Sequence, residues 1–446
     1  MARVTLPATL RERAGVLGEL EVDGASLGGV LAQLERDFPA LNGWILDEQG
    51  RLRRHVNVFV NGERVSLDND VAARDLIRVL PAISGGSDEV EVLAGTHKGL
   101  VVLRGERGGR LSVVARRLEG HPVEYAVRDP RTGTYYAAVT HGHYGPKVFF
   151  SDDATGEWAQ SDGPAFPQDT DASVTRVWSI TPGEEAGVLW AGVAPAALFK
   201  SADEGATWSL NRSLWDVPGR DEWQGGAGGL CLHSICPWPG DPARLAVGIS
   251  AAGVWITEDG GDSWRWGVKG LVPRYIPEEA RAGTTAYCVH NVHRARLRPD
   301  TLFMQFHGGV YRSDDAGDTW DDIGAGLPSD FGFPLVTDPH DPDHAYVIPL
   351  RGDFDRVPPE GRLRVYETRD AGVSWAGLGH GLPQEDAYHT VLRQAFGHDG
   401  RDPLGLYFGT EQGVLFASAD GGATWVQATE GLPPVLSVRC SPELGL

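Results

Sequence analysis

The sequence has few cysteines, no long apolar segment and a shortage of positive charge. Its 446 residues include four cysteines, at positions 231, 236, 288 and 440, and none of them form a Cys-x-x-Cys pair. This usage fits reduced thiols in a cytoplasm better than a disulfide framework. No basic segment followed by an apolar run opens the chain, and no run is long enough for a membrane span. We therefore expect a cytoplasmic protein with neither a signal peptide nor a membrane segment.

Acidic residues outnumber basic ones by 61 to 40, which gives a formal net charge of −21. Because nucleic-acid binding relies on patches of lysine and arginine, this balance argues against a nucleic-acid partner. A chain of this length exceeds one typical domain core, so two domains are expected. The 59 glycines and 29 prolines are typical of a chain with many turns.

A short motif of the form S/T-x-D-x-G-x-T/S-W recurs along the chain at intervals of 50–56 residues. Clear copies begin at Ser201, Thr257, Ser313, Thr368 and Ser418, and a degenerate copy begins at Ser151. A repeat of this length, with short apolar strands on either side, is typical of β-propeller blades. The motif resembles the Asp-box of the BNR-repeat propellers, which include sialidases, some xyloglucan hydrolases and sortilin-type receptors.

The residues of the box have structural explanations. In the copy that begins at Ser201, Asp203 can accept hydrogen bonds from backbone N–H groups of its own turn. Gly205 tolerates the positive φ that a tight connection between strands often needs. Trp208 begins the next strand and is expected to bury its ring between neighbouring sheets. We therefore expect the box to hold the fold rather than to carry chemistry.

The first ninety residues form a separate pattern. Residues 2–6 and 18–22 are predicted to form a strand hairpin, and residues 26–38 carry apolar side chains at helical spacing behind a candidate N-cap, Ser26. Residues 55–60 and 76–80 predict two further strands, with a turn at positions 61–62. The order strand-strand-helix-strand-strand predicts a small α+β domain of the β-grasp type.

Three stretches of this domain resemble the MoaD/ThiS family of ubiquitin-like sulfur carriers: LRERAG at 10–15, VNVFVNGE at 56–63 and LPAISGG at 80–86. The resemblance implies that Gly86, which follows Gly85, is adenylated by an E1-like enzyme and then serves in sulfur transfer or protein conjugation. Because Ser87 follows Gly86, this role requires a protease that cuts after Gly86. Without cleavage, the two glycines are a flexible linker on a domain kept for binding.

Residues 87–446 are expected to form a seven-bladed β-propeller, so the fold class is mainly β with a β-grasp domain at 1–86. The boxes mark six blades, and residues 90–114 resemble a seventh that lacks its inner strand. Residues 435–442 resemble the inner strands of the other repeats but have no blade of their own. We expect the tail to supply the missing strand, because this closure pairs strand edges that would otherwise be exposed.

The expected ligand face lies opposite the boxes, at the starts of the inner strands and at the turns between second and third strands. The candidate ligand-binding residues there are Glu124, Tyr125, His141, His143, Arg176, His233, His290, His293, His307 and Arg351. Converging imidazoles could hold a divalent metal, and the predicted metal set is His141, His143, His233, His293 and His307. With the two arginines they could instead bind an anion, or they could simply bond to one another and to the backbone.

Residues 90–446 also resemble bacterial BNR-repeat propellers labelled glycosyl-hydrolase-like, a label that leaves the activity open. A sialidase needs an arginine triad, an Arg-Ile-Pro motif and a Tyr–Glu pair, whereas the nearest string here is RYIP at 274–277. The sequence therefore argues against a sialidase. Glu124 is the candidate catalytic acid of a two-carboxylate glycosidase, with a loop acid as its second group. The rings of Trp215 and Trp223 in the insertion at 215–229 could stack on a ligand or cover the channel.

Two classes of function remain open. The first is a binding protein, in which a propeller recognises a small molecule, glycan or peptide and is coupled to a sulfur-carrier-type module. The second is an enzyme, hydrolytic or metal-dependent, that acts at the propeller mouth. The sequence favours the first class, because every clear motif is architectural and no catalytic set is complete.

Overall fold

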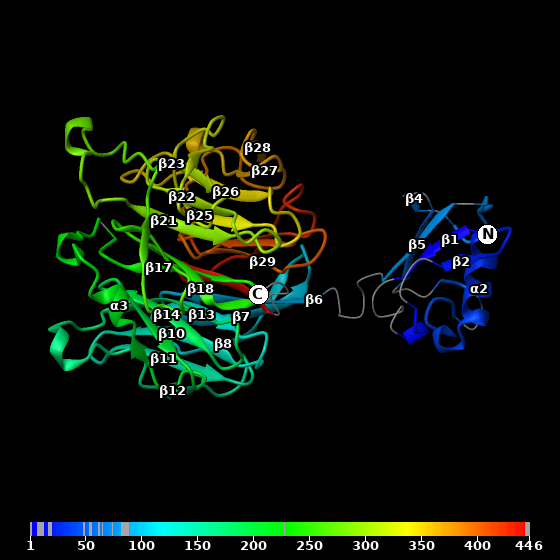
Figure 1. Cartoon of the computed structure of the whole chain (residues 1–446), viewed down its shortest axis with the longest axis horizontal. Helices are drawn as coiled ribbons and strands as arrows, with labels where there is room; N and C mark the ends of the chain where they lie inside the picture. Colours follow the sequence, from blue (N-terminus) through cyan, green and yellow to red (C-terminus); the bar gives the residue numbers. More distant parts are fainter. Residues whose placement is uncertain are drawn as a thin grey trace. The chain divides into compact units, whose positions relative to one another are not determined.

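The computed structural model describes residues 2–6, 13–16, 20–47, 50–52, 56–60, 63–64, 66–73, 75–81, 89–226 and 228–441. The chain divides into two units, Met1–Glu89 and Val90–Leu446, each with its own apolar core (Figure 1). Gly85 and Gly86 lie outside the described residues. Within the described part of the chain, no helix is long and apolar enough to cross a membrane.

In its described residues, the first unit is a five-stranded mixed sheet packed against the helix Leu27–Asp37, and the predicted β-grasp fold is confirmed. Its strands are β1 (Ala2–Thr5), β2 (Leu20–Val22), β3 (Val56–Val60), β4 (Glu63–Arg64) and β5 (Leu76–Pro81). They lie in the order β2-β1-β5-β3-β4, and β1 runs parallel to β5. This parallel pairing places the first and last strands of the domain side by side.

Helix α2 (Leu27–Asp37) begins where the sequence predicts, because Ser26 caps it. The Ser26 Oγ accepts a hydrogen bond from the Gly29 N–H at 3.2 Å. The buried face of α2 and the sheet share one core, formed by Leu27, Val30, Leu31, Leu34, Val4, Val22, Val58, Ile77 and Val79. Each buried aliphatic side chain contributes about 1.5–3 kcal/mol, so the contact between helix and sheet stabilises this small domain. A 3₁₀ turn at Pro39–Leu41 follows the helix.

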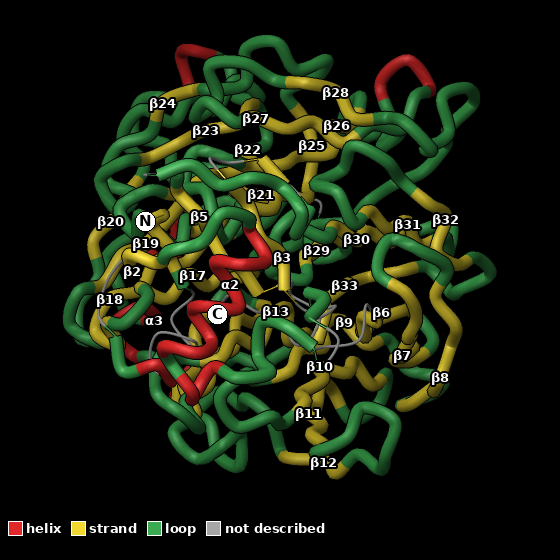
Figure 2. Tube along the Cα trace, turned by 90° about the vertical axis from the view of Figure 1, so that its right-hand side faces the viewer, coloured by secondary structure: helices red, strands yellow, loops and turns green. Residues whose placement is uncertain are grey.

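The second unit is a seven-bladed β-propeller, as the repeat predicts, and each blade is a four-stranded sheet. In Figure 2 the blades follow one another around the ring in chain order. Blade 1 contains β6 (Glu89–Thr96), β7 (Gly99–Glu106), β8 (Leu111–Arg117) and, innermost, β33 (Val435–Ser441). Blade 2 contains β9 (Val123–Arg128), β10 (Tyr135–His141), β11 (Gly145–Ser151) and β12 (Ala159–Ser161).

The next three blades repeat this order from the inside outwards. Blade 3 contains β13 (Arg176–Pro182), β14 (Leu189–Ala194), β15 (Ala197–Ser201) and β16 (Ser209–Leu210). Blade 4 contains β17 (Leu232–Trp238), β18 (Asp241–Ile249), β19 (Gly253–Thr257) and β20 (Arg265–Gly267). Blade 5 contains β21 (Val289–Arg294), β22 (Leu302–Phe306), β23 (Gly309–Ser313) and β24 (Asp321–Asp322).

The last two blades complete the ring. Blade 6 contains β25 (Phe331–Thr337), β26 (Ala345–Leu350), β27 (Val365–Thr368) and β28 (Ala376–Leu378). Blade 7 contains β29 (Phe396–His398), β30 (Leu406–Gly409), β31 (Leu415–Ser418) and β32 (Val426–Thr429). The connections hold helix α3 (Arg212–Trp215) and 3₁₀ turns at Gln168–Thr170, Arg220–Glu222, Glu278–Ala280 and Pro359–Gly361.

The C-terminal strand β33 closes the ring from inside blade 1. It pairs antiparallel with β6, from Val435 opposite Thr96 to Ser441 opposite Glu91. This pairing covers an inner edge of β6 that no earlier strand of the chain occupies, which is the closure that the tail sequence suggests. Blades 1 and 7 are also joined by an ion pair, in which Arg107 Nε lies 2.5 Å from Asp399 Oδ2.

The boxes form the hydrogen-bonded connections that the sequence predicts. Asp203 Oδ1 accepts from the Thr207 N–H at 2.8 Å, and Asp203 Oδ2 accepts from the Thr207 hydroxyl at 2.6 Å. Gly205 has a φ of 83°, and its N–H donates to Ser201 Oγ at 2.8 Å. The same contacts recur in the boxes that begin at Thr257, Ser313, Thr368 and Ser418. The box is therefore a self-contained turn.

In blades 5 and 6, the tryptophan of the box links the blade to the one before it. In blade 5, Trp320 is buried, and its Nε1 donates to the carbonyl oxygen of Gly267 in blade 4 at 3.1 Å. Trp375 of blade 6 donates in the same way to Ile323 of the preceding blade at 2.7 Å. The box residues thus have the architectural role that the sequence predicts.

Candidate functional site

Five inner strands contain a β-bulge near their starts. In β9, β13, β17, β21 and β33, one residue is inserted between two consecutive ladder pairs. The inserted residues are Glu124, Trp178, His233, His290 and Leu436. A bulge of this kind re-aims side chains. The five residues therefore occupy matched positions at one end of the central channel.

Two predicted site residues, His293 and Arg176, are not among these inserted residues. His293 pairs with Phe303 near the far end of β21, three positions after His290, and Arg176 stands two positions before Trp178. These two residues were predicted because each stands six positions before the proline that ends its repeat segment, Pro182 or Pro299, as Glu124 and His233 stand before theirs. That proline does not hold a constant place in the corner between strands. His290 and Trp178 are the counterparts of His233 and Glu124.

Arg393 occupies the end of the channel where the inner strands start. We call this region the mouth and define it by Glu124, Trp178, Cys231, Cys288, His290, His307, Phe333 and Arg393. The Arg393 guanidinium lies 5.2 Å from the Trp178 ring centroid and 5.9 Å from that of Phe333. Its Nε donates to the carbonyl oxygen of His290. A cation between two aromatic faces makes the mouth suited to a planar or anionic ligand.

The carboxylate of Glu124 is engaged by two neighbours. Glu124 Oε1 accepts from the Thr140 hydroxyl at 3.0 Å and forms an ion pair with Arg176, whose Nε lies 3.2 Å away. The glutamate is buried, and the Arg176 guanidinium also lies 4.8 Å from the Trp178 ring centroid. These contacts tie Glu124 to blade 3 and give it a structural role, so they do not support its prediction as a catalytic acid.

Polar groups from four blades, three of them side chains, close the channel below the mouth. Gln394 Nε2 donates to the His233 carbonyl oxygen at 3.0 Å, and Asn291 Nδ2 donates to the Arg393 carbonyl oxygen at 3.0 Å. Arg439 Nη1 donates to the Gln394 carbonyl oxygen at 2.9 Å. Because these residues come from blades 1, 4, 5 and 7, they can meet only at the axis.

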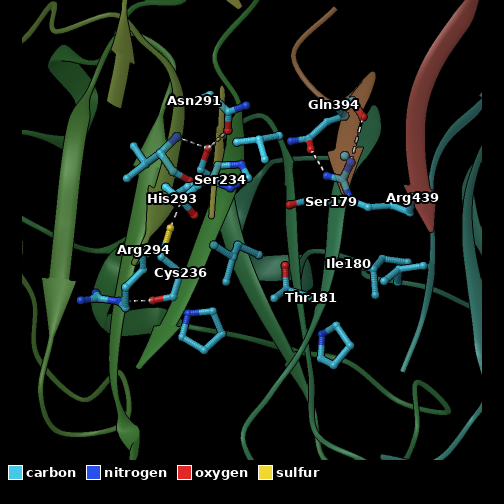
Figure 3. A pocket seen from close by; sticks show the side chains of 18 of the residues that line it. Ser179, Ile180, Thr181, Ser234, Cys236, Asn291, His293, Arg294, Gln394 and Arg439 are labelled. Atoms are coloured by element: carbon cyan, nitrogen blue, oxygen red, sulfur yellow. Dashed lines mark hydrogen bonds between the residues drawn. The ribbon is translucent and has the colours of Figure 1, made fainter. Parts of the chain in front are cut away.

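Beyond this layer lies an axial cavity of about 180 Å³, shown in Figure 3. Its lining includes His293, His398, Arg294 and Arg439, together with Tyr125, whose hydroxyl oxygen lies 3.0 Å from Arg439 Nε. Many of these residues stand at the ends of inner strands, and the antiparallel order of a blade puts the boxes at the same end. The cavity therefore faces the box side, whereas the ligand site was expected on the opposite side.

The histidines of the channel are neutral near pH 7. Burial lowers the pKa of His233 and of His290 well below the usual value, and the nearby Arg393 charge adds to this effect. Burial also lowers the pKa of His293 to about 3 and that of His398 to about 4. These imidazoles can donate one hydrogen bond or offer one lone pair, but they do not supply positive charge for an anion.

His141 and His143 lie at the turn between β10 and β11, and the contacts of His141 are local. His141 Nδ1 accepts from the backbone N–H groups of His143 at 3.1 Å and Tyr144 at 3.2 Å. The His141 ring lies 4.6 Å from His121, and His143 is exposed. This pair is therefore engaged by its own hairpin.

The predicted five-histidine metal set is wrong, because its members do not meet. His233 is fully buried, and its ring nitrogens contact Val289 O and Ser234 Oγ, each at 3.0 Å. Across the described ranges, the group of potential ligands that does converge is Cys288, His290 and His307. Burial raises the pKa of Cys288 and lowers that of His307. Only His307 of the predicted set belongs to this group.

Two other predicted features have local roles. Arg351 Nη2 lies 2.7 Å from Asp355 Oδ2 within one exposed loop. The rings of Trp215 and Trp223 flank the Arg220 guanidinium at 4.4 and 4.6 Å, and Trp223 is buried against Trp255. The insertion at 215–229 therefore packs its aromatic rings internally, which does not support a stacking platform for a ligand.

The architecture defines a class of protein: a ubiquitin-like β-grasp domain joined to a seven-bladed β-propeller. A family model described as the ThiS family matches residues 4–86. The sulfur carrier protein CysO of Mycobacterium tuberculosis (strain ATCC 25618 / H37Rv) is 33% identical over 89 residues, which cover 19% of this chain and 96% of CysO. Through its first domain the chain belongs to the ThiS family.

Two further comparisons cover different parts of the chain. Small archaeal modifier protein 1 of Haloferax volcanii is 38% identical over 68 residues, which cover 15% of this chain and 78% of that protein. The structure of the Niastella koreensis GH74 enzyme has a TM-score of 0.47 and 17% identity. That likeness covers 76% of this chain and 47% of the GH74 chain, so the chain spans less than half of the length of that structure.

Proposed function

We propose that residues 1–86 are a sulfur-carrier module held in a precursor, and that the propeller is its recognition module. A protease hydrolyses the bond between Gly86 and Ser87 and frees the Gly86 carboxylate. An E1-like enzyme then joins this carboxylate to AMP from ATP and releases pyrophosphate. A sulfide donor displaces AMP and leaves a thiocarboxylate, or an amine of a protein displaces AMP and leaves an amide conjugate.

The observation that carries this proposal is the extent of the family match, which ends at Gly86. The matched segment includes the described β-grasp sheet from residue 4 onward, and the last strand of that sheet, β5, ends at Pro81. Residues 82–86 follow β5 in the sequence, and in this proposal they are the tail that a carrier inserts into another enzyme. Glycine suits such a tail because it has no side chain to obstruct a narrow active site.

The propeller contributes recognition rather than hydrolysis in this proposal. Its mouth offers the Arg393 guanidinium between the rings of Trp178 and Phe333. Glu124, the candidate acid of the alternative hydrolase, is bound by Arg176 and Thr140. The observations therefore favour a site that binds a planar or anionic group over a pair of carboxylates that cleaves a glycosidic bond.

Intact mass spectrometry of the protein from its native cell tests the proposal. We expect a fragment that ends at Gly86, part of it with one oxygen replaced by sulfur. Gly86→Ala should prevent the sulfur-bearing form, and Ser87→Ala, which alters only the residue beyond the carrier, is the matched control. Full-length chain alone, under conditions in which the cell makes thiocarboxylates, would contradict cleavage and leave the domain as an uncleaved docking module.

A further inference from the structure

Three metal-ligating side chains of blade 5 meet at the mouth. Cys288 Sγ and one ring nitrogen each of His290 and His307 all lie within 4.8 Å of one another. Cys288 directly precedes β21, His290 lies within β21, and His307 directly follows β22. We propose that these three side chains form a zinc site of the propeller, a role that does not depend on the sulfur-carrier function.

The backbone of one hairpin brings the three side chains together. The His307 N–H donates to the Cys288 carbonyl oxygen at 3.0 Å, so these residues face each other across β21 and β22. Opposed residues of an antiparallel pair have Cβ atoms about 4.5–5.5 Å apart. His290 is the residue inserted in the bulge of β21, and one of its ring nitrogens lies within 4.8 Å of the ligand atoms of Cys288 and His307. The site therefore rests on paired strands rather than on a separate loop.

His290 is oriented for metal binding before any ion arrives. Its Nδ1 lies 2.6 Å from the Gly332 carbonyl oxygen. Because a carbonyl oxygen only accepts, Nδ1 carries the proton and Nε2 carries the free lone pair. A backbone carbonyl bonded to the second ring nitrogen commonly fixes a metal-binding histidine in this way. Phe333 stacks on the ring at 4.8 Å and Phe331 meets it edge-on at 5.2 Å.

Tyr275 positions the other two ligands. Its hydroxyl accepts from the Cys288 N–H at 2.6 Å and donates to the Ala286 carbonyl oxygen at 2.6 Å. Its ring lies 4.5 Å from that of His307. Cys288 Sγ approaches Ser250 Oγ at 3.9 Å, a weak contact that a metal ion can replace. Tyr275 is thus a positioning residue. It holds the backbone of Cys288 and lies against one side of the His307 ring.

The donor set indicates zinc. One thiolate and two imidazoles suit this borderline ion, which usually takes four ligands. Bonds of about 2.0–2.3 Å place the ligand atoms of a tetrahedral site about 3.3–3.8 Å apart. The three atoms therefore need to close in by at most about 1.0–1.5 Å on binding. Cys288 and His307 are half-buried, so the fourth position faces the accessible mouth and can hold water or a ligand.

Cobalt substitution of the full-length protein tests this site. The protein is purified without a polyhistidine tag, stripped with a chelator and titrated with Co²⁺ while its absorption spectrum is recorded. We expect one ion per chain, a thiolate-to-cobalt charge-transfer band in the near ultraviolet, and loss of the band when Zn²⁺ is added. Cys288→Ser should remove the band, and His307→Ala should weaken Co²⁺ binding by at least about tenfold.

Cys236→Ser is the matched control, because Cys236 is a thiol of β17 outside the mouth, and its Sγ donates to the Val292 carbonyl oxygen at 3.2 Å. This variant should keep the parent spectrum and affinity. Circular dichroism verifies that each variant is folded. Two results with the parent protein alone would overturn the proposal. The first is no uptake of Co²⁺ or Zn²⁺, and the second is Co²⁺ binding without the thiolate-to-cobalt charge-transfer band. Equal binding by the parent and the folded Cys288→Ser variant also overturns it.

Discussion

Arg439, in the last strand of the chain, binds Gln394, in the segment before β29, at the axis of the propeller. Arg439 Nη1 donates to the Gln394 carbonyl oxygen at 2.9 Å, and Nη2 donates to Gln394 Oε1. Gln394 Nε2 in turn donates to the carbonyl oxygen of His233. One arginine thereby links the first, fourth and last blades across the channel and separates the mouth from the axial cavity.

Replacement of this arginine should destabilise the propeller. Arg439 is 8% exposed, and its removal leaves the buried oxygens of Gln394 and Tyr125 without their charged donor. We expect Arg439→Ala to lower the unfolding free energy by about 3 kcal/mol. Denaturant unfolding followed by tryptophan fluorescence measures this loss. Arg362→Ala, which removes an exposed ion pair with Glu360, should cost less than about 0.5 kcal/mol.

Deletion of residues 435–446 should disrupt closure of the ring. The deletion exposes the inner edge of β6 and removes the buried side chains of Val435, Val438 and Cys440. Burial of three such side chains is worth about 5 kcal/mol or more. Differential scanning calorimetry should show a strongly lowered propeller transition. Deletion of 442–446 alone, which leaves β33 intact, is the control, and equal melting of the two truncations would refute the closing role of β33.

The box aspartates should make the propeller sensitive to acid. Hydrogen bonds from the Ser263 hydroxyl and N–H, and from the Thr257 hydroxyl, lower the pKa of Asp259 to about 2. In an unfolded chain the pKa of aspartate is about 3.9. The ionised carboxylate therefore stabilises the fold above about pH 4, and this contribution is lost as the pH falls towards about 2.

Melting temperatures of Asp259→Asn and the parent, measured from neutral to acidic pH, check this sign. The difference between them should be largest at neutral pH and should shrink as the pH falls through the range of the carboxylate. Asp262→Asn changes the net charge equally within the same box and serves as the control. A difference that stays constant with pH, or that Asp262→Asn reproduces, would show that the hydrogen bonds of Asp259 are not responsible.

Local patterns in the sequence were sufficient for much of the fold. The box spacing predicted the blades, because Asp203, Gly205 and Trp208 act within one turn and its neighbouring blade. The N-cap at Ser26 and the apolar face of α2 were predicted for the same reason. The unpaired strand pattern at 435–442 predicted the closure of blade 1, since an inner strand without a blade must pair with a blade that lacks one.

The candidate site was predicted less well, because it depends on register across blades. His290 and Trp178, rather than His293 and Arg176, are the inserted residues. The number of residues between each inner strand and the proline that follows it does not reveal where these bulges lie. Arg393 and Gln394 were missed because they precede β29, a three-residue inner strand that has no clear sequence pattern. Cys288 was missed because the bulge at His290 breaks the two-residue alternation of β21, so the sequence spacing does not show which side chains share a face.

By itself, the sequence determined the two domains, the sulfur-carrier resemblance that ends at Gly86, and the number and order of the blades. These features depend on short motifs whose residues act on near neighbours in the chain. Only the tertiary structure decided which side chains share the channel, because Arg393, His233 and Arg439 meet from blades far apart in sequence. His293 follows His290 by three positions along β21, a rise of about 10 Å, which puts His293 in the axial cavity and His290 beside Cys288 at the mouth.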